Sequence, residues 1–220
     1  MPKQLSLCLA IVIICGLAPL AAPIEAPPPA GRVDVLFSPG GGCEQRVVAE
    51  LAKAARTIRM QAFTFTSPVI AEALADAKTR GIDCEVILDK SNQTDRFTAA
   101  PTVQAAGIIC LVDDAHTVAN NKVILIDETT LLTGSYNFTR AAEASNAENL
   151  LVITGMPEVQ KAYADNYAKH REHARPFVRA AGAAGGATAP SADAAAETRG
   201  PVYVTANGKR YHRAGCEFLH

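Results

Sequence analysis

The side chains best suited to chemistry lie between Asn120 and Glu148. Four residues separate Lys122 from Asp127, and six more precede the turn Gly134-Ser135-Tyr136-Asn137. A lysine ammonium, a serine hydroxyl and an asparagine amide can all donate hydrogen bonds to phosphoryl oxygens and stabilise charge that accumulates there. Glu148 could orient the second ring nitrogen of a histidine, as a carboxylate does in a catalytic triad. The spacing therefore predicts a site that handles phosphate groups.

Taken one at a time, these residues also have ordinary structural roles. Lys122 could be a charge at a strand edge, Asp127 a cap at a strand end, and Ser135 and Asn137 residues of a turn. Six matching residue types lie within 29 residues, however. The combination favours a functional interpretation over several separate structural ones.

The stretch resembles the phospholipase D superfamily, whose members share the pattern H-x-K-x(4)-D-x(6)-G-S-x-N. The likeness is strongest to small secreted bacterial members of the endonuclease type, which carry a single copy of the motif. It covers about Val33 to Arg175 and includes four further segments, 58–66, 113–116, 137–143 and 146–149. The resemblance implies an α/β fold in which a mixed central β-sheet is sandwiched between helices.

In that family two motifs meet face to face at one active site, so a single-motif chain is expected to form a two-fold homodimer. One histidine attacks phosphorus to give a phosphohistidine intermediate, and the other protonates the leaving alcohol. No metal or organic cofactor is implied. Carried over by position, the resemblance implies that Lys122 and Asn137 hold the phosphate and that the Ser135 hydroxyl supports it. The Asp127 carboxylate would brace the site, and the Glu148 carboxylate would orient the histidine.

Asn120 is the one departure from the motif, because it stands where the family has its nucleophilic histidine. An amide cannot attack phosphorus or shuttle a proton near neutral pH. The histidines of the chain are His116, His170, His173, His212 and His220. His116 is nearest to the motif, but it lies four residues upstream of Asn120 and out of phase with Lys122, so we consider it only as an accessory residue. We predict a chain that folds, dimerises and binds phosphodiesters but turns them over poorly.

Three functions fit these residues. The first is a non-specific endonuclease acting on DNA or RNA, favoured by the small single-motif architecture and by a basic C-terminal tail. The second is a phospholipase D that hydrolyses phosphatidylcholine-like lipids, because the same motif serves both substrates. The third is a catalytically inactive phosphodiester-binding protein, which Asn120 favours. The formal net charge of -1 does not indicate a nucleic-acid binder, so any attraction to phosphates must come from local clusters.

Composition divides the chain into four parts. Lys3 and the apolar stretch Leu5–Ala22 are typical of a cleaved secretory signal, although about 18 apolar residues can also span a bilayer as an uncleaved anchor. We predict a signal peptide or N-terminal anchor (1–26), a phosphodiesterase domain (33–179), an Ala/Gly-rich linker (180–200) and a small basic tail (201–220). A cleaved signal implies a secreted or periplasmic protein, and membrane contact is expected only if the segment is retained.

Alternating apolar strands and amphipathic helices must position the motif. Strands are predicted at 33–37, 58–65, 84–88, 108–112, 123–126 and 150–153. Helices are predicted after the turn at 38–42 and at 68–81, 102–106 and 157–175. Ser67 and Pro68 supply a cap and a first-turn proline, and Gly81 supplies a helix end. Because several strands are apolar on both faces, the pattern predicts a layered α/β sandwich with a mostly buried sheet.

The remaining cysteines and histidines give weaker signals. Cys84 and Cys110 lie in apolar runs and are expected to be buried free thiols. The tail resembles a small basic module appended to exported nucleases, but His212, Cys216 and His220 offer only three metal ligands, so a solvated tail is favoured. The basic cluster at residues 170–175 is explained equally well as a solvated helix end.

Overall fold

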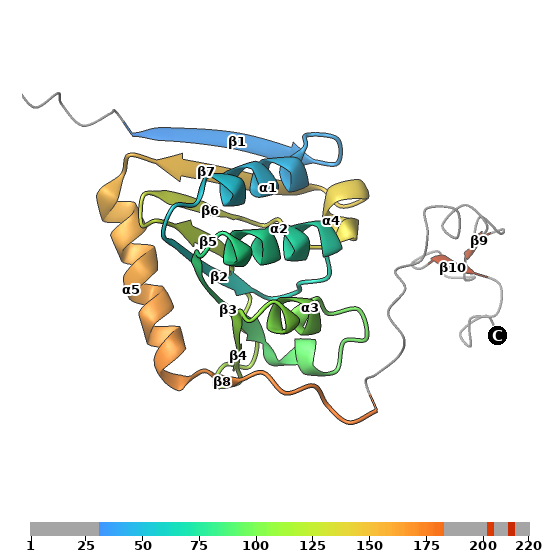
Figure 1. Cartoon of the computed structure of the whole chain (residues 1–220). Helices are drawn as coiled ribbons and strands as arrows, with labels where there is room; N and C mark the ends of the chain where they lie inside the picture. Colours follow the sequence, from blue (N-terminus) through green and yellow to red (C-terminus); the bar gives the residue numbers. More distant parts are fainter. Residues whose placement is uncertain (1–30, 183–201, 205–210, 214–220) are drawn as a thin grey trace, which may run out of the picture.

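A sheet of eight strands with helices on both faces forms the body of the protein (Figure 1). The computed structural model describes residues 31–182, 202–204 and 211–213. The predicted α/β fold with a mixed central sheet is confirmed. The predicted signal or anchor (1–26) and most of the linker and tail lie outside the described residues. Within the described ranges, no helix is both long enough and apolar enough to cross a bilayer.

The strands follow one another across the sheet in the order β1-β7-β6-β5-β2-β3-β4-β8. Their bounds are β1 (Arg32–Ser38), β2 (Thr57–Ala62), β3 (Asp83–Asp89), β4 (Ile109–Asp113), β5 (Lys122–Ile126), β6 (Thr130–Gly134), β7 (Glu148–Thr154) and β8 (Arg175–Pro176). The pairs β2–β3 and β3–β4 are parallel, and every other neighbouring pair in this sheet is antiparallel. In the tail, β9 (Val202–Val204) pairs antiparallel with β10 (Tyr211–Arg213).

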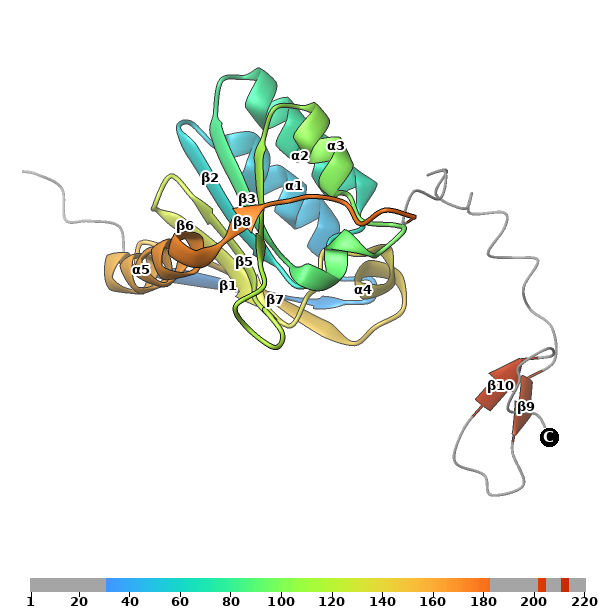
Figure 2. The ribbon, with the colours of Figure 1, turned by 90° about the horizontal axis from the view of Figure 1, so that it is seen from below.

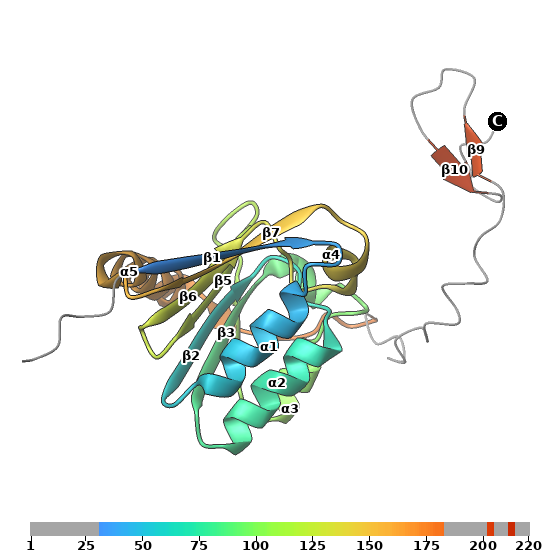
Figure 3. The same ribbon diagram turned by 90° about the horizontal axis from the view of Figure 1, so that it is seen from above.

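Helices cover the sheet unequally. Their bounds are α1 (Cys43–Lys53), α2 (Pro68–Thr79), α3 (Ala100–Ala105), α4 (Arg140–Ala144) and α5 (Pro157–His173), with a 3₁₀ turn η1 at Lys90–Gln93. The helices α1, α2 and α3 lie together on one face (Figure 3), and α5 lies on the other (Figure 2). Each face has its own buried apolar cluster, so the central strands are apolar on both sides.

The predicted signals at the ends of α2 are confirmed. Ser67 Oγ accepts a hydrogen bond from the backbone N of Ile70 at 3.1 Å, and Pro68 occupies the first turn. Gly81 follows the helix with φ 88°, the left-handed conformation that glycine adopts without a steric penalty. The predicted free thiols are confirmed as well, because Cys84 and Cys110 are both free and buried.

Several predicted boundaries were wrong for identifiable reasons. The strand predicted at 58–65 ends at Ala62, and Phe65 instead forms an isolated bridge with Phe138. The helix predicted at 102–106 begins at Ala100, so that a proline lies in its first turn. The last helix ends at His173 rather than near Arg175, because the chain there extends into β8 and pairs with β4.

The sequence did not reveal β6, the strand that completes the motif hairpin. It pairs antiparallel with β5, and the chain reverses through Asp127 (φ 53°) and Glu128 (φ 59°). Positive φ values in a hairpin turn are usually signalled by glycine or asparagine, neither of which occurs at these two positions. The short helix α4 and η1 were also missed, since each covers about one turn.

Hydrogen bonds from α5 to a buried carboxylate fix this helix against the sheet. Glu85 in β3 is 4% exposed. Arg171 Nε lies 2.9 and 3.0 Å from its two carboxylate oxygens, and the Tyr167 hydroxyl donates to Oε1 at 3.0 Å. A buried carboxylate needs such partners, so the orientation of α5 about its axis is defined.

Candidate active site

One edge of the sheet collects most of the predicted site residues. β5 begins at Lys122, β6 ends at Gly134 and β7 begins at Glu148. Because these three strands are antiparallel neighbours, the start of β5, the end of β6 and the start of β7 meet at the same edge. The structure therefore brings together Lys122, the turn after β6 and Glu148, as the motif spacing predicts.

The ammonium group of Lys122 is held by Asn120, the residue that differs from the family motif. Lys122 Nζ donates to the backbone oxygen of Asn120 at 2.9 Å and also to Oδ1 of the same residue. It lies 5.0 Å from the centroid of the Phe63 ring, within the range of a cation–π contact. Burial lowers the pKa of Lys122, and the negative charge of Glu148 opposes this shift. The site thus holds a partly desolvated cation facing a carboxylate.

Ser135 is fixed by Asn149, a residue that the motif comparison did not assign. Ser135 Oγ accepts from the backbone N of Asn149 at 3.0 Å and from its Nδ2 at 3.2 Å. In return, the backbone N of Ser135 and that of Tyr136 both donate to the Asn149 backbone oxygen at 3.1 Å. These bonds hold the turn rigidly against β7. The only signal for this role was the segment 146–149, which resembled the family without naming a function for Asn149.

Gly134 is required at the start of this turn. Its φ is 145°, and a Cβ atom added there would lie 2.3 Å from the Asn149 backbone oxygen. No real side chain tolerates such a contact with a backbone atom, so any other residue would push β6 and β7 apart. The glycine therefore sets the distance at which Ser135 meets Asn149.

Asn137 has a polar atom left unsatisfied at the same edge. Its Oδ1 is buried without a hydrogen-bond partner among the described residues, and its backbone oxygen accepts from Thr139 N at 2.8 Å. The neighbouring Tyr136 and Phe138 are each 1% exposed and anchor the segment in the core. A buried acceptor without a partner costs free energy, and in native proteins this exception is concentrated at functional sites.

The Glu148 side chain accepts a hydrogen bond from a neighbouring asparagine. Its Oε1 accepts from Asn146 Nδ2 at 3.2 Å. The side chain is half-buried and acts electrostatically on Lys122. Its role in orienting a histidine stays a prediction, because position 120 carries no ring.

The structure places Asp127 at the opposite end of β5 from Lys122. Asp127 follows the last residue of β5, so five residues at about 3.3 Å each place it roughly 16 Å from Lys122. Its carboxylate accepts from the backbone N of Ala55, Arg56 and Thr57 at 2.7, 2.7 and 2.8 Å. Burial raises its pKa, but the three hydrogen bonds outweigh that effect and hold the pKa below its usual value. Asp127 anchors the start of β2 and does not reach a substrate at the Lys122 edge.

His116 is also placed away from Lys122. Its Nδ1 lies 2.9 Å from Oδ2 of Asp113, the last residue of β4. Between β4 and β5 stand β3 and β2, so three strand spacings, roughly 14 Å, separate the two positions. The structure therefore gives no support to His116 as an accessory residue of the motif site.

Comparisons with known proteins found one matching family and several similar sequences. Residues 47–171 match the family described as "Cardiolipin synthase, PLD-like domain". A "Phospholipase D" of Rickettsia conorii is 36% identical over 136 residues, which are 62% of this chain and 68% of that protein. A "Mitochondrial cardiolipin hydrolase" of Xenopus laevis is 30% identical over 155 residues, covering 66% and 73% of the two chains.

Solved structures with a similar fold point the same way. Nuc from Salmonella typhimurium, a phospholipase D family member, superposes with a TM-score of 0.65 at 34% identity, over 67% of this chain and 98% of Nuc. NucT from Helicobacter pylori superposes with a TM-score of 0.62, over 67% of this chain and 99% of NucT, and its 19% identity supports the shared fold alone.

Proposed function

The chain belongs to the phospholipase D superfamily of phosphodiesterases, and on that basis we propose that it is a non-specific endonuclease whose turnover is impaired by Asn120. The observation that carries this proposal is the cluster at the edge of the sheet. A partly buried lysine, a serine held in a hydrogen-bonded turn and the side chain of Asn137, whose amide nitrogen can donate a hydrogen bond, lie together there. These groups suit the binding of a phosphodiester, and the residue that should attack it lacks a nucleophilic ring.

Nucleic acid is the substrate that the chain's architecture favours. The chain spans 98% of Nuc at 34% identity, and the name of that protein indicates a nuclease. This chain carries a single motif, as the small endonuclease-type members of the family do, so two paired copies would complete one active site. In the Asn120→His form the phosphohistidine would form at position 120, and Lys122, Ser135 and Asn137 would hold the phosphate.

Hydrolysis of phosphatidylcholine-like lipids is the second candidate. It is favoured by the Rickettsia conorii relative, which is 36% identical and is named a phospholipase D. A third candidate is an inactive protein that binds phosphodiesters. The contact between Lys122 and Asn120 favours it, since both side chains occupy the place where a nucleophile and a phosphate would meet.

We propose further that two chains pair with a shared active site, as the single motif implies. Val33, Val35 and Phe37 on β1 are 43%, 50% and 65% exposed and lie on one side of the strand. Phe37 pairs with Asn149 of β7, so this apolar stripe ends beside the candidate site. On the face that carries this stripe, α5 contacts β4 and β5, and Gln160 in its first turns donates to the backbone oxygen of Ile153, which pairs with Val33 at the far end of β1 from Phe37. A second copy on this stripe would bring its motif close to the first.

The homodimer is tested by Phe37→Glu. A charge buried in an apolar interface is costly, so we expect this variant to be monomeric in light scattering while the unchanged chain is dimeric. Val178→Glu is the matched control, because Val178 is equally apolar and 67% exposed but lies beyond β8 at the other edge of the sheet. The proposal fails if the unchanged chain is monomeric, or if Phe37→Glu leaves the dimer intact.

The substrate is tested with Asn120→His, the form expected to turn over. With EDTA present, we expect this variant to nick plasmid DNA at a rate well above its release of choline from phosphatidylcholine vesicles. The reverse ranking would replace the endonuclease with the phospholipase. Activity on neither substrate, together with retained binding of an oligonucleotide in fluorescence anisotropy, would favour the inactive binding protein.

A further inference from the structure

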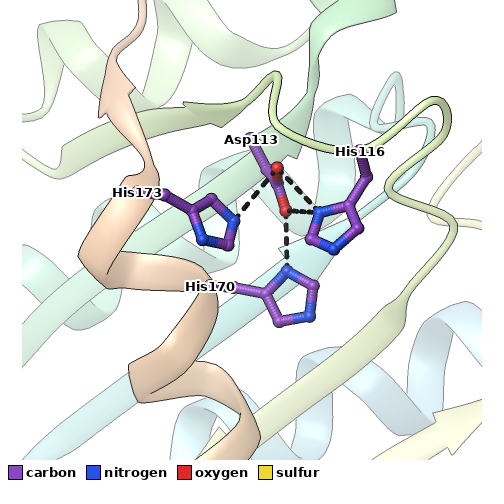
Figure 4. Close-up of side chains that lie close together, drawn as sticks. All are labelled: Asp113, His116, His170 and His173. Carbon is purple, nitrogen blue, oxygen red and sulfur yellow. Dashed lines mark hydrogen bonds and ion pairs between the residues drawn. The ribbon is translucent and has the colours of Figure 1, made fainter.

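A second group of ionisable side chains lies beyond the end of β4 and is not used by the site described above. Figure 4 shows three imidazole rings turned toward the carboxylate of Asp113. His116 comes from the loop after β4, and His170 and His173 come from the last turn of α5. Asp113 itself is fully buried, at 0% exposure.

The contacts in this cluster converge on one point. Asp113 Oδ2 lies 2.6 Å from His170 Nδ1 and 2.9 Å from His116 Nδ1, and its Oδ1 lies 3.2 Å from His173 Nε2. The four ligand atoms all lie within 4.8 Å of one another. Since His170 and His173 are three residues apart on a helix, both rings project from the same face.

Hydrogen bonding alone satisfies this cluster poorly. His173 Nε2 is buried and, despite its distance of 3.2 Å from Asp113, makes no hydrogen bond of acceptable geometry. The ring centroids are 4.9, 5.3 and 5.6 Å apart, so charging all three imidazoles would place like charges side by side. A cation at the centre would instead use one nitrogen lone pair from each neutral ring and one carboxylate oxygen.

We propose that Asp113, His116, His170 and His173 bind one divalent transition-metal ion, and that zinc is the ion this donor set suits best. Three imidazole nitrogens and one carboxylate oxygen form a tetrahedral zinc site, with metal–ligand distances of about 2.0–2.2 Å. Ligand atoms in such a site lie roughly 3.4 Å apart, a spacing that follows from those distances. The four ligand atoms here lie within 4.8 Å of one another, and His116, whose side chain is 47% exposed, is the least confined of the four residues.

The scaffold around the cluster fits a structural ion rather than a reactive one. α5 is already fixed by the bonds of Tyr167 and Arg171 to Glu85, so two ligands are held before any ion binds. Of the other two ligands, Asp113 precedes the loop 114–121 and His116 lies within it, and this loop leads directly into Lys122. The ion would therefore tie the end of α5 to the loop that carries Asn120. Three strand spacings, roughly 14 Å, separate it from the phosphate site, so it takes no part in the chemistry there.

The test is a titration of the full chain after it has been freed of metal with EDTA and desalted. We expect one Co²⁺ ion per chain with the intense visible absorption of tetrahedral coordination, displacement of Co²⁺ by Zn²⁺, and a Tm raised by several degrees in the presence of zinc. His170→Gln and His116→Gln are each expected to weaken zinc binding at least about 100-fold, because each removes one of four ligands. Circular dichroism would show that both variants remain folded; His116 lies in an exposed loop, so its variant keeps the test valid if His170→Gln does not fold.

The control is a chain with His212→Ala and Cys216→Ala, which removes potential ligands from the tail and leaves the cluster intact. This variant should keep the full stoichiometry, affinity and absorption spectrum. Metal binding that is lost in the tail variant but unchanged in His116→Gln would overturn the proposal. So would the failure of the unchanged chain to bind Co²⁺ or Zn²⁺ at millimolar concentrations, which lie far above the dissociation constants of structural zinc sites.

Discussion

Asn120→His is expected to increase the rate of phosphodiester cleavage by about 10³-fold or more, because it supplies the one group that the motif lacks. Every other motif residue at this edge is already in place. The Lys122 ammonium lies beside position 120, and Asn149 holds Ser135 in a fixed turn. The substitution also removes the Asn120 amide oxygen that now accepts from Lys122, and so leaves this cation available to a phosphate. The measurement is the initial rate of plasmid nicking in EDTA, compared with that of the unchanged chain.

Asn121→His is the matched control for this gain. It introduces the same ring one residue further along, and neighbouring residues of an extended segment project in opposite directions. Asn121 Nδ2 lies 3.4 Å from Gln61 Oε1, whereas the side chain of Asn120 contacts Lys122. We expect the control to remain as slow as the unchanged chain. Equal rates for the unchanged chain and Asn120→His would show that the asparagine does not limit turnover.

The sequence predicted the edge of the site because the motif places its residues at strand ends. Lys122 and Glu148 begin antiparallel strands and Gly134 ends the strand between them, so the topology alone makes them neighbours. The same argument fails for Asp127, since a five-residue strand carries it to the opposite edge. The spacing of the motif residues predicted the family correctly. It did not predict which of these residues lie at the same end of the sheet.

The histidine cluster could not be predicted from the sequence. His170 and Asp113 are 57 positions apart, and they meet only because β8 returns the chain to the edge of β4 after α5. In the sequence, His170 and His173 lie within a basic run that is typical of a solvated helix end. The strand that reveals their position, Arg175–Pro176, has only two residues and includes a proline, so no periodic pattern signals it.

Lys122→Met in the Asn120→His background is expected to lower kcat by about 10²–10³-fold. Charge accumulates on the phosphoryl oxygens during attack, and a preorganised donor in a partly desolvated site is worth this much in catalysis. Lys122 is half-buried, and this burial lowers its pKa although the charge of Glu148 acts in the opposite direction. The measurement is single-turnover cleavage of a labelled oligonucleotide. Lys161→Met on α5 removes the same charge from an exposed site, where Lys161 pairs with Asp165, and should leave the rate unchanged.

Asp127→Asn in the same background separates chemistry from folding. Asn tolerates the positive φ of this position but weakens the acceptor of three backbone N–H groups, so we expect the free energy of unfolding to fall by about 2 kcal/mol. Because the folded pKa of Asp127 is lowered, its contribution is present above the unfolded pKa and is lost as the pH falls through the folded value. The variant's stability deficit should therefore shrink in acid, while kcat at neutral pH stays within about twofold of the parent. A loss of kcat comparable to that of Lys122→Met, in a variant that is still fully folded, would show that Asp127 takes part in catalysis.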